Sequence, residues 1–135
     1  MRFFKIFVLL TFFTACAGRQ NKYTWPEEKE KHQLSEVVVK MRECGFSQVV
    51  IFITTDWCPP CRKVKEYWKA RTSPVPFYVV DSFSLTVQER YVLVLMDVPN
   101  KVPVCIIING DKHDIGVGYN MCAEGLEVKL RKLKR

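Results

Sequence analysis

The sequence predicts an α/β domain with a mixed central β-sheet and helices on both of its faces. Short runs of β-branched and aromatic residues alternate with longer amphipathic segments, which is typical of strands joined by helices. Near the C-terminal end, two apolar segments flank Asn109-Gly110-Asp111, a turn sequence that joins antiparallel strands. The predicted order is α-β-α-β-α-β-β-α in a chain of 135 residues, which suffices for one domain.

The first predicted elements lie between residues 27 and 55. Residues 27–44 are expected to form a helix, because four apolar residues recur at the spacing of one buried face: Leu34, Val37, Val38 and Met41. Gly45 follows as a terminating glycine. Residues 47–55 are expected to form a strand, and their near-continuous apolar run predicts a central strand that is covered on both faces.

The most informative stretch is Trp57-Cys58-Pro59-Pro60-Cys61, between the apolar strand and an amphipathic segment that runs to about residue 70. Two cysteines three apart at a helix start lie on one face, so they can form a disulfide or bind a metal. The N-terminus of a helix favours a thiolate, the nucleophile of disulfide exchange. A zinc site needs two more ligands at short spacing, and the remaining cysteines and histidines are scattered. No metal is therefore predicted, and a structural disulfide is the alternative to a redox pair.

The two prolines limit how strongly the first cysteine can be activated. A sulfur at a helix start can accept N–H bonds from the residues that follow it, but proline has no N–H. The N–H of Cys61 is the main local donor that remains, so we expect only a moderate lowering of the Cys58 pKa.

Residues 71–76 contain two prolines and end the helix, and residues 77–81 are expected to form a short strand. The segment 84–98 is ambiguous, because residues 91–95 also suit a strand. We prefer a helix, since Thr86 and Glu89 match a capping box and four apolar residues fit one helical face: Val87, Tyr91, Val94 and Leu95.

The last elements are two strands at 104–108 and 114–118 and a helix at 123–132. This helix is expected to turn Leu126, Leu130 and Leu133 inward and its basic residues outward.

Trp-Cys-x-x-Cys between a strand and a helix resembles the active site of the thioredoxin superfamily, and the element order over about residues 27–133 resembles the thioredoxin fold. Val102-Pro103, directly before a strand, resembles the cis-proline of that family, and Gly116 or Gly118 matches a family glycine beside the site. The resemblance implies a thiol–disulfide oxidoreductase that needs no cofactor beyond its own disulfide. Cys58 is then the attacking thiol and Cys61 the resolving one, while the remaining site residues position the substrate: Trp57, Pro59, Pro60, Val102 and Pro103.

Two departures from the family pattern matter. Many thioredoxins carry a buried Asp five residues before the active-site Trp, and this chain has Phe52 there. The base for Cys61 is then water or another side chain. The segment between Asp81 and Pro103 is also longer than in a minimal thioredoxin, which suggests a surface specific to a partner.

Residues 1–18 resemble an export signal of bacterial lipoprotein type. Arg2 and Lys5 precede an apolar stretch too short to span a bilayer. Thr14-Ala15-Cys16 resembles the end of a lipobox, although Phe13 stands where Leu is usual. We therefore expect a lipid anchor on Cys16, with plain cleavage or an uncleaved anchor as alternatives, a tether at 19–26 and the domain at 27–135.

Each of these alternatives places the domain outside the cytoplasm, in an expected periplasmic, membrane-anchored location. There it is expected to reduce or exchange disulfides in cysteine-containing exported proteins, as a monomer recycled by a membrane or soluble redox partner. The alternatives are a lipid-anchored binding or assembly protein with a structural disulfide, an oxidase, or a peroxidase that uses Thr54 or Thr55. The net charge of +7 does not predict nucleic-acid binding, because no basic patch is interleaved with aromatic residues.

The other cysteines are scattered singly along the chain. If Cys16 is acylated, five remain, so at least one stays free or pairs between molecules. Cys44, Cys105 and Cys122 are interpreted as small hydrophobic residues in or near the core.

Overall fold

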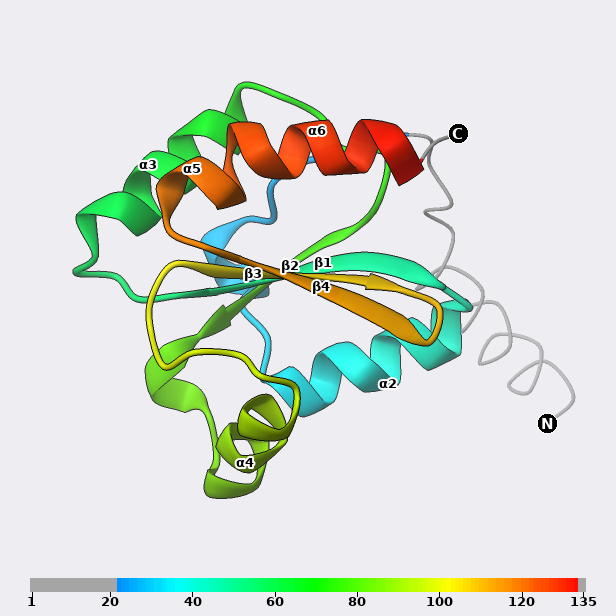
Figure 1. Cartoon of the computed structure of the whole chain (residues 1–135), viewed down its shortest axis with the longest axis vertical. Helices are drawn as coiled ribbons and strands as arrows, with labels where there is room; N and C mark the ends of the chain where they lie inside the picture. Colours follow the sequence, from blue (N-terminus) through cyan, green and yellow to red (C-terminus); the bar gives the residue numbers. More distant parts are fainter. Residues whose placement is uncertain (1–21, 134–135) are drawn as a thin grey trace, which may run out of the picture.

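The computed structural model describes residues 22–133 (Figure 1). The predicted export segment at 1–18 and the lipidation at Cys16 lie outside the described residues. A four-stranded sheet in the order β2-β1-β3-β4 forms the centre, and helices cover both of its faces. The α/β architecture predicted from the sequence is thereby confirmed. The strands are β1 (Gln48–Thr54), β2 (Phe77–Asp81), β3 (Val104–Asn109) and β4 (Lys112–Val117).

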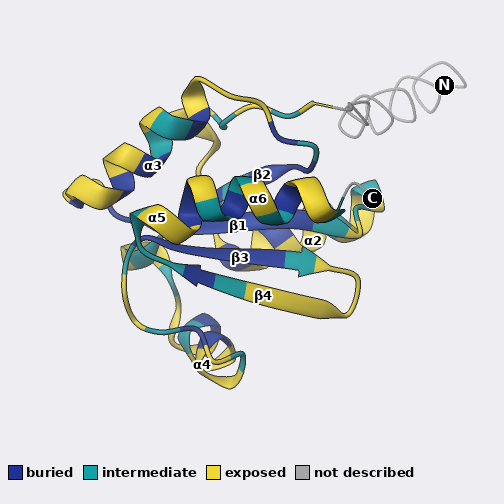
Figure 2. Ribbon diagram, turned by 45° about the horizontal axis from the view of Figure 1, so that its top comes forward, coloured by how far each residue is buried: buried dark blue, intermediate teal, exposed yellow. Residues whose placement is uncertain are grey.

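The central strand is β1, which pairs parallel with β2 and antiparallel with β3. Its residues 49–53 are at most 4% exposed, so the prediction of a strand covered on both faces is confirmed (Figure 2). The β3–β4 hairpin turns at Gly110, whose φ of 64° lies in the left-handed region that glycine adopts readily. Strand β4 begins at Lys112, two residues before the predicted start.

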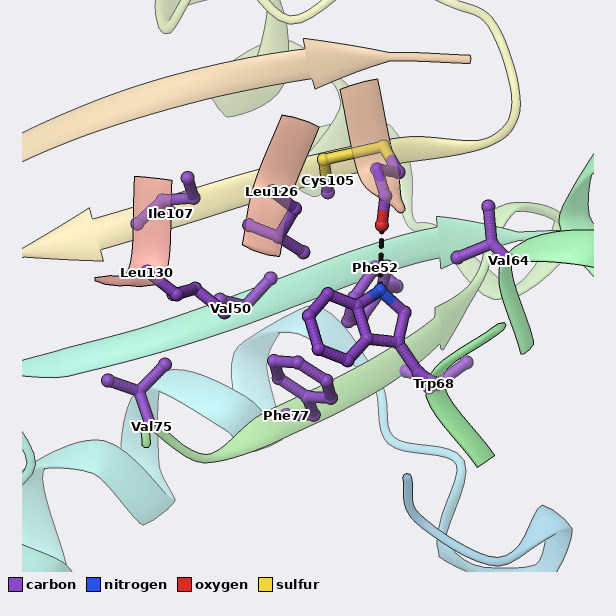
Figure 3. Packing of buried hydrophobic residues seen from close by; sticks show 12 residues of the cluster. Val50, Phe52, Val64, Trp68, Val75, Phe77, Cys105, Ile107, Leu126 and Leu130 are labelled. Atoms are coloured by element: carbon purple, nitrogen blue, oxygen red, sulfur yellow. Dashed lines mark hydrogen bonds between the residues drawn. A yellow bond between two sulfur atoms is a disulfide. The ribbon is translucent and has the colours of Figure 1, made fainter. Parts of the chain in front are cut away.

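One face of the sheet is covered by α3 (Pro59–Lys69), α5 (Tyr119–Cys122) and α6 (Glu124–Leu133). Trp68 is the largest fully buried side chain here, and its indole Nε1 donates a 2.8 Å hydrogen bond to the carbonyl of Cys122 (Figure 3). This bond joins α3 to α5 within the apolar cluster. Leu126 and Leu130 of α6 point into the same cluster, as predicted.

The opposite face is covered by α2 (Leu34–Cys44) and α4 (Val87–Leu95). The single helix predicted at 27–44 is wrong in its first part, which contains only a 3-10 turn at Glu28–Glu30. The reason is that the His32 N–H donates to the carbonyl of Val79 at 3.0 Å and adds an isolated bridge to β2. A capping box between Gln33 and Glu36 then starts α2.

Helix α4 exists as predicted, with its Thr86–Glu89 capping box, but the predicted buried face is wrong. A 3-10 turn at Ser82–Ser84 precedes it. Glu89 points inward, because its carboxylate accepts the N–H of Thr86 and the N–H of Ser35, each at 2.9 Å. Leu93, one turn later, therefore faces the core, and the four residues assigned to the buried face are 64–80% exposed: Val87, Tyr91, Val94 and Leu95.

Residues 22–26, which lie in the predicted tether, contact the domain. Tyr23 and Ser73 exchange two backbone hydrogen bonds of 2.7 and 2.8 Å. The ring of Trp25 lies 4.8 Å from that of Phe52. Over residues 22–133, every helix is too short or too polar to cross a membrane.

Candidate active site

Cys58 and Cys61 lie where the chain leaves the sheet and enters a helix. Strand β1 ends at Thr54, and α3 begins at Pro59 with Cys58 as its N-cap. The two cysteines form a disulfide, with their Cα atoms 5.2 Å apart, and are 3% and 4% exposed. Two cysteines three apart at a helix start thus form the disulfide that the sequence analysis describes as possible.

The Cys58 sulfur occupies the position of a capping side chain. It accepts the Cys61 N–H at 3.2 Å. The intervening positions N1 and N2 are Pro59 and Pro60, which have no N–H to offer. The expectation that Cys61 supplies the local donor is confirmed, so a reduced Cys58 at this position gains one backbone hydrogen bond and the field of the helix.

The predicted cis-proline lies at the same end of the sheet. The Val102–Pro103 peptide bond is cis, and the next residue, Val104, opens β3 opposite Ile53 of β1. The carbonyl of Pro103 accepts the N–H of Gly118 at 2.9 Å. The start of β3 and the end of β1 are neighbours, so Pro103 and the cysteine loop share one edge of the molecule.

Trp57 directly precedes Cys58 and is 65% exposed. A large indole left in solvent beside a buried disulfide offers an apolar surface to a protein that approaches the sulfurs. Pro59 and Pro60 are also exposed. This arrangement suits the substrate-positioning role predicted for the three residues.

A cavity of about 450 Å³ lies beside Cys61. Thr54, Thr55 and Trp25 contribute to its wall, and two ion pairs lie along it. Lys31 Nζ is 2.6 Å from Asp56 Oδ1, and Lys65 Nζ is 2.5 Å from Glu28 Oε1. The disulfide is thus flanked by apolar core on the sheet side and by a charged cavity on the other.

The ion pairs hold their members in the charged form. The hydrogen bond from Lys31 lowers the pKa of Asp56 and raises that of Lys31 itself. The hydrogen bond from Lys65 likewise lowers the pKa of Glu28. These carboxylates are therefore poor proton acceptors for a nearby thiol.

Phe52 is fully buried beneath this region, between the rings of Trp25 at 4.8 Å and Phe77 at 5.0 Å. The aromatic packing leaves an apolar environment where the family pattern has a carboxylate. At the position of the departure noted in the sequence, the ring of Phe52 therefore packs against that of Trp25, a residue that sequence analysis did not assign to the site.

A second disulfide joins Cys105 of β3 to Cys122 of α5, with Cα atoms 5.6 Å apart. The prediction that these two residues lie in or near the core is confirmed, but they lie there as a disulfide, which the sequence analysis did not predict. Both are at most 1% exposed, and their sulfurs lie 3.6 and 3.4 Å from the carbonyl oxygen of Gly116. A Cβ on Gly116 would meet the Cys105 sulfur at 2.6 Å, so the strand needs glycine here. None of the cysteines within the described part of the chain is free.

The described residues offer no group of three or more His, Cys, Asp or Glu side chains placed to hold a metal ion.

No protein-family model and no curated protein matches the sequence. Solved structures do match the fold. Thioredoxin f from spinach chloroplast is 16% identical, with a TM-score of 0.58 over 85% of this chain and 96% of that one. Fasciola hepatica thioredoxin is 19% identical, with a TM-score of 0.57 over 74% and 93%. Trypanosoma brucei brucei thioredoxin is 18% identical, with a TM-score of 0.54 over 81% and 96%. The chain therefore has the thioredoxin fold, and its Cys58–Cys61 pair fits the C-x-x-C site of that fold.

Proposed function

We propose that this protein is a thiol–disulfide oxidoreductase that works through Cys58 and Cys61. The observation that carries the proposal is the placement of the pair. Cys58 caps α3, bonds to Cys61 and receives its N–H, at the edge of a thioredoxin-fold sheet where a cis-proline opens the neighbouring strand.

In the reducing direction, the Cys58 thiolate attacks one sulfur of a substrate disulfide. The substrate S–S bond breaks, a mixed disulfide to Cys58 forms, and the other substrate sulfur leaves as a thiolate. Cys61 then loses its proton and attacks the Cys58 sulfur, which releases the second substrate thiolate and forms the Cys58–Cys61 disulfide. Trp57 and Pro103 position the substrate backbone, and no other cofactor is used.

The proposed direction is reduction or exchange rather than strong oxidation. Stabilising the Cys58 thiolate favours the reduced pair, and this makes a dithiol site more oxidising. Here the sulfur accepts one backbone N–H, because two prolines occupy the positions between the cysteines. Weak stabilisation of the thiolate supports a low potential.

The proposed compartment lies outside the cytoplasm, with Cys16 as a lipid anchor in a periplasmic setting. The export-type sequence of residues 1–18 supports this. A second, buried disulfide at Cys105–Cys122 supports it independently, because such bonds form and persist in oxidising compartments. The partners are then cysteine-containing exported proteins and a redox protein that recycles the Cys58–Cys61 pair.

The proposed lipid anchor is tested by the variant Cys16→Ser, which should lose its association with membranes.

The rival is a non-enzymatic binding or assembly protein in which Cys58–Cys61 is only structural. Reduction of insulin by dithiothreitol separates the two functions. We expect wild-type protein to accelerate insulin precipitation and Cys58→Ser to abolish the acceleration. Wild-type protein that leaves the rate at the level of dithiothreitol alone would favour the binding protein.

A further inference from the structure

Thr55 follows the end of β1 and carries an unpartnered buried hydroxyl. The residue is 7% exposed, and its Oγ1 is the one buried side-chain polar atom in residues 22–133 that has no hydrogen-bond partner. Buried polar groups are nearly always bonded, since an unmade hydrogen bond costs free energy. A hydroxyl left without a partner in the disulfide state needs a reason.

The surroundings of Thr55 suggest that its hydroxyl has a hydrogen-bond partner in the reduced protein. Thr55 and Cys61 line the same cavity, and the backbone carbonyl of Thr55 accepts the N–H of Cys58 at 3.5 Å. In the disulfide, the Cys61 sulfur has no S–H and accepts hydrogen bonds only weakly. On reduction, Cys61 gains either an S–H donor or an anionic acceptor, and a hydroxyl can bond to both.

The charged groups along the cavity that are already paired are poorly suited to bond to Cys61. Lys31 is paired with Asp56, and Lys65 is paired with Glu28. Arg62 donates to the carbonyl of Asp56. The lowered pKa values of Asp56 and Glu28 make these two carboxylates weak proton acceptors, and the strand beneath contributes the apolar Phe52.

We propose that the Thr55 hydroxyl is the hydrogen-bond partner of Cys61 in the reduced protein. When Cys61 resolves the mixed disulfide, this hydroxyl relays the proton of the Cys61 thiol to solvent. This inference rests on the proposed exchange at Cys58–Cys61. In the resolving step, Thr55 Oγ1 accepts the proton of the Cys61 thiol and gives its own hydroxyl proton to water in the cavity. The Cys61 thiolate forms a bond to the Cys58 sulfur, the bond from Cys58 to the substrate sulfur breaks, and the substrate leaves as a thiolate.

The consequence is a redox-linked hydrogen bond, which stabilises the reduced state and is absent from the oxidised state. Thr55→Val removes the hydroxyl and keeps the side-chain shape, so it should shift the equilibrium of the pair with glutathione about tenfold towards the disulfide. That factor corresponds to a potential about 30 mV lower. Thr55→Ala should shift the equilibrium in the same direction, and Thr55→Ser should restore the wild-type value within about twofold.

Thr54→Val is the matched control, because Thr54 lines the same cavity and is 9% exposed, but its hydroxyl is not an unpartnered buried atom. It should change the equilibrium by less than about twofold. An equal shift in Thr54→Val and Thr55→Val, or no shift in Thr55→Val, would overturn the proposal.

Urea unfolding of both redox forms gives a second readout. Thr55→Val should leave the oxidised protein as stable as the oxidised wild type or more stable. It should make the reduced protein less stable than the reduced wild type. Equal changes in both forms would assign Thr55 a purely structural role and contradict the proposal. The glutathione equilibrium does not require turnover, so it tests Thr55 even if wild-type protein fails to reduce insulin.

Discussion

At the residue scale, the reactivity of Cys58 depends on which backbone donors its sulfur can reach. A capping side chain accepts from the second or third helical residue. In α3 these are Pro60 and Cys61, and only Cys61 donates. The printed sequence was sufficient to predict this, because the absence of an N–H is a property of proline itself and does not depend on the fold.

Replacing Pro60 with histidine supplies the missing donor. The second N–H should stabilise the Cys58 thiolate, lower its pKa, and make the pair more oxidising. The ultraviolet absorbance of the thiolate during a pH titration measures the first effect, and equilibration with glutathione measures the second. A wild-type potential near that of the strong periplasmic oxidants, about −120 mV, would contradict the argument.

The unpartnered hydroxyl of Thr55 is a feature that could not be predicted from single residues of the sequence. Thr54 and Thr55 are neighbours in sequence and both are buried, yet only the second has an unbonded buried Oγ1. Segments distant in sequence, among them Trp25 and α3, line the cavity beside both threonines, so their sequence alone does not show which hydroxyl lacks a partner.

At the element scale, the helices show what periodicity can and cannot predict. The pattern in 84–98 predicts a helix, and α4 (Val87–Leu95) confirms it, but the buried face differs because Glu89 bonds to the N–H of Ser35 in another helix. Although burial raises the pKa of Glu89, its hydrogen bonds from Thr86 and Ser35 lower it overall. The two hydrogen bonds of Glu89, rather than the apolar residues of α4, therefore determine which side of this short helix faces the core.

The two faces of α4 should therefore respond differently to truncation. Leu93 is 7% exposed and Val94 is 66% exposed. Leu93→Ala should lower the free energy of unfolding by about 2–3 kcal/mol, whereas Val94→Ala should change it by less than about 0.5 kcal/mol. Urea unfolding of the oxidised protein measures both. A larger loss from Val94→Ala than from Leu93→Ala would contradict the assigned face.

Helices α3 and α6 are joined by a hydrogen bond from the Tyr67 hydroxyl to Glu127. Burial, together with this bond, raises the pKa of Tyr67 to about 12. The bond also lowers the pKa of Glu127, helped by Arg131. The pair therefore stabilises the fold only while the phenol is protonated and the carboxylate is ionised.

This contact makes stability depend on pH at both ends of the range. An unfolded tyrosine titrates near 10, so the contribution of Tyr67 is complete below about pH 10 and is lost as the pH rises towards 12. The contribution of Glu127 is complete above its unfolded pKa and is lost as the pH falls through its lowered folded value. Tyr67→Phe should cost about 1 kcal/mol near neutral pH and flatten the alkaline loss. Tyr91→Phe, at an exposed position, is the control. An unchanged alkaline profile in Tyr67→Phe would contradict the assignment.

At the scale of the whole molecule, the order of elements predicted the sheet and its two covered faces, because each strand and helix carries its own local pattern. The Cys105–Cys122 bond could not be predicted in the same way. Its partners are 17 residues apart, and the fold brings them together by placing α5 against β3 and β4. The break in the helix predicted at 27–44 has the same origin, since it depends on a bond between His32 and the edge of β2.

The second disulfide should support the fold without taking part in exchange. Its sulfurs are buried and remote in sequence from the Cys58 loop. The double variant Cys105→Ala/Cys122→Ala should lower the free energy of unfolding by about 3 kcal/mol, as expected for a closed loop of this size. Insulin reduction should persist at temperatures where the variant is folded. Loss of activity in a variant that is shown to be folded would assign this pair a redox role.

The central claim is that Cys58 and Cys61 exchange disulfides in that order, and trapping of the mixed disulfide tests it most directly. Each single serine variant is reacted with a disulfide-containing peptide, and the mass of the intact protein is measured. Cys61→Ser should accumulate a covalent adduct to Cys58, since no thiol is present to resolve it, whereas Cys58→Ser should accumulate little. Equal adduct formation by the two variants, or none by either, would contradict the account.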